Sequence, residues 1–124
     1  MWPGHRSTQP LYSYDGGEYP DPLSSCKGYS APAGLTIVVQ FPDEVRNPTF
    51  SFKRPSGESL PACEVDASNY RNANSSAQSL GRSLLAGDNV VLVIPKDPLE
   101  PGKSYVVKVT SGSETARSRF TISP

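Results

Sequence analysis

The chain has 124 residues, the usual size of one domain and enough to bury a core without a metal ion. Twelve basic and twelve acidic residues cancel, which argues against an overall field that attracts nucleic acid or an anionic membrane. No apolar stretch is long enough for a transmembrane helix, and no signal-peptide pattern is present. Thirteen prolines and ten glycines separate short apolar segments, which predicts many short strands joined by turns.

Residues 1–34 differ from the rest of the chain. They hold four of the six tyrosines and five prolines, and no periodic apolar pattern runs through them. We expect an ordered N-terminal extension with a first edge strand near Tyr12, packed on a domain formed by residues 35–124. The opening Met1-Trp2-Pro3-Gly4 is typical of a start codon added to a fragment, so we expect a longer natural chain with its targeting signal upstream.

In most segments from residue 35 onward the apolar residues alternate as they do in half-buried strands, whereas residues 89–94 are continuously apolar and are expected to form a buried strand. Leu35, Ile37, Val39 and Phe41 fall on one face at a period of two. Further strands are expected at residues 48–53 with Phe50 and Phe52 inward, 60–66, 89–94, 105–110 with Tyr105, Val107 and Val109 inward, and 114–122 with Phe120 and Ile122 inward.

Residues 67–88 show no such alternation. The part up to residue 78 is rich in Asn, Ser and Ala, a composition typical of a loop. The part from Ser79 to Leu85 fits a short helix, a turn or a strand. Because Gly81 and Gly87 disfavour a helix, we expect a strand or an irregular crossover. Asn74-Ser75-Ser76 matches a glycosylation acceptor, a pattern that is also typical of a polar loop.

The segment between two of these strands has the pattern of a tyrosine corner. Leu99, Pro101, Gly102 and Tyr105 place a leucine and a Pro-Gly turn just before a tyrosine at the start of a strand. In that motif the hydroxyl bonds to the chain upstream in a Greek-key sandwich. We therefore predict an all-β, immunoglobulin-like or fibronectin III-like antiparallel β-sandwich of about seven strands.

The two cysteines, Cys26 and Cys63, leave two alternatives open. A disulfide would imply an oxidising compartment and would tie the N-terminal extension to a sheet edge. Two free thiols are the other alternative, because the spacing cannot show that the two Cα atoms come within reach. The antibody pattern is absent, since Val107 stands where a second cysteine would follow the corner tyrosine.

The chain resembles a known class of module at two places. The segment Asn89 to Tyr105, followed by Arg119-Phe120-Thr121-Ile122, is similar to the end of bacterial immunoglobulin-like modules. Tyr14 to Leu23, followed by Leu35 to Phe41, resembles the domain after the cysteine-rich-secretory-protein-like (CAP) domain of secreted bacterial proteins. The resemblance implies an extracytoplasmic accessory role and supplies no catalytic residues.

Candidate residues for catalysis or metal binding are few. A single histidine, His5, is too little for a metal site or a catalytic triad. Carboxylates in a turn-rich loop suit a hard cation such as calcium, but they are also common solvated turn residues. A glycosidase needs two carboxylates at a fixed gap. The carboxylates weighed for these roles are Asp15, Glu18 and Asp21 in the loop, and Asp43, Glu44, Glu64 and Asp66 at strand ends. We expect no cofactor, no metal and no catalytic residue.

Aromatic side chains give a better indication of a binding surface. Trp2, Tyr12, Tyr14, Tyr19 and Tyr29 lie in the N-terminal extension, where exposed rings could stack on sugars or bind a protein. The alternative is that they cover one sheet and fill its edge.

A small cationic stripe is a further candidate. Arg117 and Arg119 alternate on the last strand, and Lys108 lies on its expected hairpin partner. A solvated sheet face that resists aggregation is the alternative explanation.

These observations predict a non-catalytic accessory module, structural, spacing or adhesive, of a larger secreted or surface bacterial protein. We expect an extracellular or cell-surface location. Its partner would be a neighbouring domain or another surface protein, and not nucleic acid. The alternative is a carbohydrate-binding module that uses the N-terminal aromatic rings on a polysaccharide.

Overall fold

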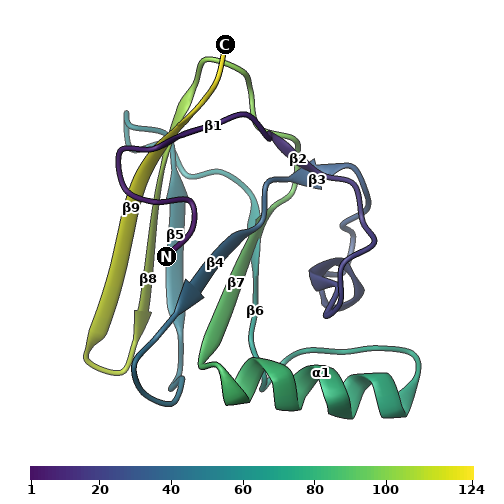
Figure 1. The fold of residues 1–124 in the computed structure, drawn as a ribbon. Helices are drawn as coiled ribbons and strands as arrows, with labels where there is room; N and C mark the ends of the chain where they lie inside the picture. The colour runs from purple at the N-terminus through teal and green to yellow at the C-terminus, as the bar shows by residue number, and fades with distance from the viewer.

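The computed structural model describes residues 1–124 and is mostly β, with three sheets and one short α-helix (Figure 1). A mostly β fold was expected, and the arrangement is consistent with a β-sandwich. In chain order the elements are β1 Thr8–Gln9, β2 Ser13–Tyr14, the 3-10 helix η1 Pro22–Ser25, β3 Ala33–Gly34, β4 Ile37–Gln40, β5 Thr49–Lys53, β6 Ala62–Val65, α1 Ser75–Gly87, β7 Val90–Pro95, β8 Ser104–Ser111 and β9 Glu114–Ile122.

Two sheets form the body of the molecule. One has the strand order β1-β9-β8-β5, with the short β1 parallel to β9, and the other has the order β4-β7-β6. The chain changes sheets after β4, β5 and β7, so both sheets contribute to one core. The strands supply this core with every second residue, as the alternation predicts: Leu35, Ile37, Val39, Phe41, Phe52, Val91, Val93, Tyr105, Val107, Val109, Phe120 and Ile122 are all buried in it, together with Leu99.

A second core lies on the other side of the three-stranded sheet. In β7, Val91 and Val93 face the first core while Leu92 and Ile94 face the second, so both faces of this strand are buried. This explains why the segment is continuously apolar and does not alternate. Part of the N-terminal extension and α1 cover this face, and Tyr14, Cys26, Ala33, Val65, Tyr70 and Leu85 complete the second core.

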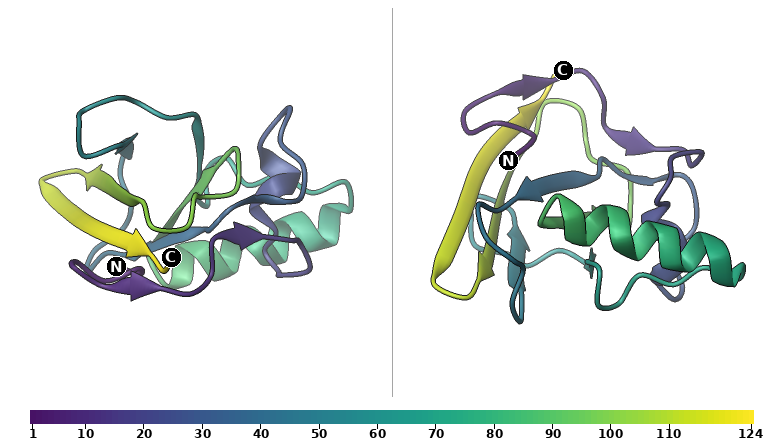
Figure 2. Two further views of the ribbon diagram at one scale, coloured as in Figure 1. Left: turned by 90° about the horizontal axis from the view of Figure 1, so that it is seen from above. Right: turned by 60° about the horizontal axis from the view of Figure 1, so that its bottom comes forward.

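The first nine residues close one side of the sandwich. Trp2 exchanges two backbone hydrogen bonds of 2.8 Å with Val38 in β4, and β1 pairs with the end of β9. The hydroxyl of Ser118, a fully buried residue, donates to the Pro3 carbonyl at 2.8 Å. The segment thus joins the edge strands of the two sheets, and Figure 2 shows it running beside β9.

Residues 75–87 form a helix, so the expected strand or irregular crossover is wrong. The Asn74 side chain caps the helix by accepting from the Ala77 N–H at 2.9 Å. Gly81 is buried on the helix face that meets Tyr70, where only a residue without a side chain fits. Packing against the second core therefore outweighs the low helix propensity of glycine. The helix crosses the lower end of the sheet in Figure 1, and no helix here has the length and apolar character needed to cross a membrane.

The structure also differs from the expectation for Phe50. It was expected inward with Phe52, yet 37 % of its surface is exposed while Phe52 is buried. Both residues lie on the same face of β5, but β5 is an edge strand and Phe50 is near its end, beyond the cover of the facing sheet. The segment 54–58 makes a tight turn, with the Gly57 N–H donating to the Arg54 carbonyl at 2.9 Å. The chain then crosses to the other sheet, so β5 and β6 do not form a hairpin.

Candidate functional site

The largest cavity has a volume of about 740 Å³ and lies at the end of the sandwich occupied by α1. Three segments form its wall: the loop between β4 and β5, the turn after β6, and the end of α1 with the start of β7. Binding sites are usually concave surfaces of this size with a few converging polar groups. The polar residues that line it are Glu44, Arg46, Asn47, Asp66, Ser68 and Asn89.

The loops that form this cavity are anchored to the sheets. The Arg46 N–H donates to the hydroxyl of Ser111 at 2.8 Å, which holds the β4–β5 loop against the β8–β9 hairpin. The Asn89 amide donates to the Phe41 carbonyl at 3.2 Å. Asn47 and Asn89 have positive φ angles of 42° and 53°, a conformation that asparagine tolerates better than most residues. The shape of the cavity is therefore fixed by these anchors.

A pair of carboxyl groups lies beside the cavity. Glu64 and Asp66 are two residues apart, at the end of β6, so their side chains point to the same face. Asp66 is only 3 % exposed and accepts from both the N–H, at 2.7 Å, and the hydroxyl of Ser68. The Asn69 amide donates to Oε1 of Glu64 at 3.1 Å, whereas Oε2 of Glu64 is buried with no donor.

The two carboxyl groups titrate in opposite directions. Burial, together with the hydrogen bond and the charge of Asp66, raises the pKa of Glu64 to about 9. Burial also acts to raise the pKa of Asp66, but hydrogen bonds from Glu64 and Ser68 outweigh it and lower that pKa. Glu64 is therefore a neutral acid at pH 7 and Asp66 an ionised acceptor, the relationship found in many acid–base sites.

The pair takes part in hydrogen bonds within the fold. The oxygens of Asp66 already accept hydrogen bonds from Ser68 and Glu64, and Asp66 is almost completely buried. A general acid or base must come within hydrogen-bond reach of a substrate atom. Glu64 and Asp66 instead fix the turn after β6 against Asn69, whose side chain also accepts from the Asp66 N–H at 2.8 Å.

The other candidate carboxylates do not join this pair. Asp43 and Glu44 are exposed on the β4–β5 loop, and Glu44 lies 3.9 Å from Arg46. Asp21 caps η1 by accepting from the Leu23 N–H at 2.9 Å. No three His, Cys, Asp or Glu side chains gather in a way that could hold a metal ion. Asp15, Glu18 and Asp21, the candidate calcium ligands, do not form such a group.

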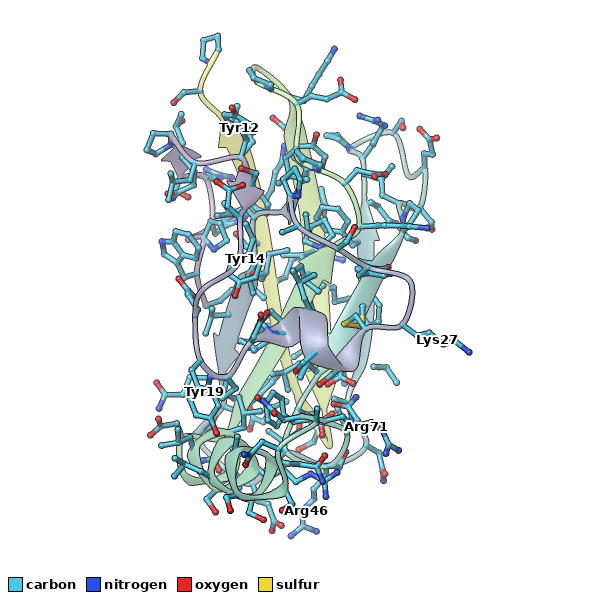
Figure 3. All side chains as sticks on the ribbon, turned by 90° about the vertical axis from the view of Figure 1, so that its right-hand side faces the viewer. Tyr12, Tyr14, Tyr19, Lys27, Arg46 and Arg71 are labelled. Atoms are coloured by element: carbon cyan, nitrogen blue, oxygen red, sulfur yellow. A yellow bond between two sulfur atoms is a disulfide. The ribbon has the colours of Figure 1, made fainter.

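The five N-terminal aromatic residues do not share one surface. Trp2, Tyr12 and Tyr19 are exposed by 41 %, 48 % and 46 %. Figure 3 shows Tyr12 near the upper end of the molecule and Tyr19 beside the helix near the lower end. The Tyr19 hydroxyl donates to the Ala77 carbonyl, and its ring meets Tyr70 edge-on at 6.5 Å.

Tyr14 was expected among the exposed ligand-binding rings, but it is buried. It belongs to the second core and is 7 % exposed, because residues 10–34 fold over the three-stranded sheet. Its hydroxyl donates to Asp21 at 3.1 Å, and burial raises its pKa to about 12. Tyr29 is half-buried with the Lys96 ammonium 5.9 Å from its ring centre. Neither ring is fully exposed.

The basic residues of the last two strands lie together. Lys108 and Arg117 are direct cross-strand partners, and Arg119 follows two residues later on the same face. All three side chains are exposed. His5 lies nearby, since its Nδ1 accepts from the Arg119 N–H at 3.0 Å. This use of Nδ1 gives His5 a structural contact at the edge of β9.

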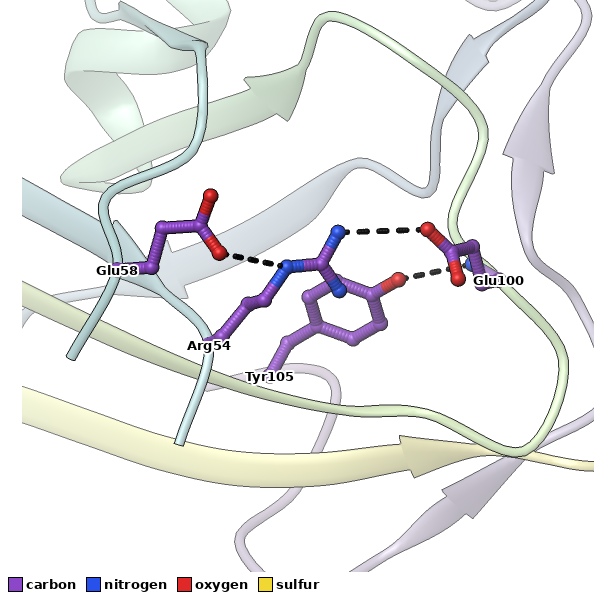
Figure 4. Close-up of polar contacts among 4 residues, drawn as sticks. All are labelled: Arg54, Glu58, Glu100 and Tyr105. Carbon is purple, nitrogen blue, oxygen red and sulfur yellow. Dashed lines mark hydrogen bonds and ion pairs between the residues drawn. The ribbon is translucent and has the colours of Figure 1, made fainter. Parts of the chain in front are cut away.

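The tyrosine corner has the expected geometry. The Tyr105 hydroxyl accepts from the Glu100 N–H at 2.8 Å, and Leu99 is buried in the first core. Gly102, in the turn, has a φ of 79°, which favours glycine. Figure 4 shows Arg54 next to this corner, where its guanidinium bonds Glu100 at 3.3 Å and Glu58 at 3.2 Å.

Cys26 and Cys63 form a disulfide, with their Cα atoms 6.1 Å apart. Cys63 lies on the edge strand β6 and Cys26 just after η1, so the bond joins the N-terminal extension to the three-stranded sheet. Cys26 belongs to the second core, and Cys63 is partly buried against it.

Several residues of these sites were missed by sequence analysis. Arg46, Asn47 and Asn89 line the cavity. Lys53, on the neighbouring strand β5, adds a fourth cation to Lys108, Arg117 and Arg119. The two asparagines in turn-rich segments were a signal for positive φ, but nothing local indicates that the two segments meet.

Comparisons of the chain with known protein families, with curated proteins and with solved structures find no match.

Proposed function

We propose that this chain is a non-catalytic accessory module of an extracytoplasmic protein, built as an immunoglobulin-like sandwich. Its role is to space, brace or present a neighbouring domain or a surface partner. The observation that carries the proposal is the Cys26–Cys63 disulfide, because disulfides persist in oxidising compartments and are rare in the cytosol.

The strand order supports the immunoglobulin-like assignment. In that fold, strands A, B, E and D share one sheet and strands C, F and G the other. Here β4, β7 and β6 correspond to B, E and D, and β5, β8 and β9 to C, F and G. The tyrosine corner then falls before strand F, where such domains carry it. The short β1 would then correspond to strand A, but here it pairs with β9, the equivalent of strand G, and not with the equivalent of strand B.

The carboxyl pair supports a non-catalytic role. Asp66 is buried and already accepts hydrogen bonds from Ser68 and Glu64, which ties it to the turn after β6. The anchored loops give the cavity a fixed shape that suits contact with a partner.

One experiment tests this proposal by measuring both the location of the protein in the cell and the redox state of its two cysteines. An antibody against the domain would be used on the medium, envelope and cytoplasm of the source cells, with thiols labelled by a maleimide polymer before reduction. We expect an unlabelled band larger than 13.3 kDa outside the cytoplasm. A cytoplasmic chain that runs at 13.3 kDa without the reagent and shifts upward by two polymer labels with it would overturn the proposal.

A further inference from the structure

Of the four faces of the two main sheets, one is left uncovered. The inner faces meet in the first core, and the N-terminal extension with α1 covers the outer face of the β4-β7-β6 sheet. The outer face of β5, β8 and β9 has no layer over it, and it forms the left side of the molecule in Figure 1. We call this surface the basic face.

The basic face carries cations without acids. In strand register, Lys53, Val106 and Arg119 form one row, and Ser51, Lys108 and Arg117 form the next. The outward positions of these strands hold no aspartate or glutamate; the remaining ones are Thr49, Ser104, Thr110, Thr115 and Thr121. None of the four cations is in an ion pair, although the whole chain is neutral.

The arrangement of these cations lowers the stability of the sheet. Lys108 and Arg117 are directly opposite each other, and like charges in that position destabilise a sheet. Charges that protect a sheet from aggregation belong on edge strands. Lys108, however, lies on β8, which has β5 on one side and β9 on the other. A bound anion would offset the repulsion between these two residues.

The chemistry of the face favours one class of polyanion. It has hydroxyls among the cations and no aromatic ring, so it lacks the stacking that single-stranded nucleic acid uses. Val106 is its only apolar side chain, which is too little to insert into a lipid surface. A hydroxyl-lined cationic surface is complementary to a linear glycan with carboxylate or sulfate groups.

We propose that the basic face, with Lys53, Lys108, Arg117 and Arg119 as its charged contacts, binds a linear acidic polysaccharide. The preference for a glycan over duplex nucleic acid rests on the extracytoplasmic location in the proposed function. Repeating anionic groups would lie across β8 and β9, where successive outward side chains on one strand are about 7 Å apart.

Binding by the purified protein tests this directly. Heparin oligosaccharide is the sulfated probe and oligogalacturonate the carboxylated one, each measured by calorimetry at low and at physiological salt. We expect binding that weakens as salt rises, and a loss of roughly tenfold or more in the variant K108S/R117S. The thermal midpoint of this variant checks that it is folded.

The matched control is K27S/R71S, which removes the same charge. Figure 3 shows Lys27 and Arg71 on the opposite side of the molecule from the basic face. This control should bind as the wild type does. Equal weakening in both variants, or no binding of either glycan at low salt, would overturn the proposal. Tighter binding of a DNA duplex or of phosphatidylserine vesicles than of both glycans would overturn the choice of partner. These outcomes do not depend on the compartment in which the protein is found, so they are distinct from failure of the proposed function.

Discussion

The ring of Tyr70 lies so close to Gly81 that a Cβ carbon at position 81 would overlap it. Tyr70 is fully buried between the sheet and α1, and its hydroxyl accepts from the Asn72 amide at 3.2 Å. The glycine that seemed to argue against a helix is therefore the residue that lets the helix approach the second core.

Gly81→Ala should destabilise the protein by roughly 1–3 kcal/mol, because overpacking against Tyr70 outweighs the gain of about 1 kcal/mol in helix propensity. Gly87→Ala is the matched control, since a Cβ there meets nothing within 4 Å. It should be neutral or stabilising. Urea unfolding of both variants measures the difference, and a stabilised Gly81→Ala would contradict the close approach of helix and ring.

Tyr105→Phe should cost roughly 1–3 kcal/mol in unfolding free energy. The ring keeps its stacking with Phe52 at 5.5 Å and with Phe120 at 5.9 Å, but the Glu100 N–H loses its acceptor. Tyr12→Phe, at an exposed ring, is the control and should change little. Equal midpoints for the Tyr105 variant and the wild type in chemical denaturation would mean that the corner bond contributes nothing.

Removal of the disulfide in C26S/C63S should cost roughly 3–4 kcal/mol, because the bond closes a loop between residues 37 positions apart. The loss should be uneven along the chain. Hydrogen exchange should quicken most in residues 10–34, which the bond holds on the second core, and least in β8 and β9. Uniform quickening across the chain would show that the extension is held by other contacts.

Glu64→Gln should change how stability depends on pH. The folded-state pKa of Glu64 is raised to about 9 from an ordinary 4.5, so between these values the folded state keeps a proton that the unfolded state has lost. The wild type therefore loses stability as pH rises through this window. Because Glu64 is partly solvated, we expect the glutamine variant to gain only about 1–3 kcal/mol relative to the wild type between pH 5 and pH 8. Parallel stability curves across that range would rule out the raised pKa.

Arg117→Glu should separate stability from binding. A glutamate opposite Lys108 replaces repulsion by attraction, which is worth roughly 0.2–1 kcal/mol in a cross-strand pair. The same change should weaken binding of an acidic glycan by roughly tenfold or more, because it alters the charge of the face by two, as K108S/R117S does. Denaturation and calorimetry on one preparation check both effects, and a variant that binds as well as the wild type would exclude Arg117 from the contact.

Local pattern predicted the parts of the fold whose faces are set by strand periodicity. The residues from Leu35 to Phe41 and from Tyr105 to Val109 are buried as their alternation requires, since a period of two fixes which side chains share a face. The turn before Tyr105 was equally local, because a few residues of a tyrosine corner carry its geometry. The candidate carboxylates Glu64 and Asp66 could be named from the sequence, but their opposite titration could not, because it depends on burial and on Ser68 and Asn69.

The sequence by itself determined the mostly β fold, the positions of most strands and the corner at Tyr105. Only the tertiary structure decided that residues 10–34 and α1 cover one sheet and leave the other sheet's outer face bare. That choice depends on contacts between distant segments, such as Tyr70 with Gly81 and Cys26 with Cys63. Periodicity reports how a segment is exposed, but it does not report which segment covers it. The cavity and the basic face both arise from that second kind of information.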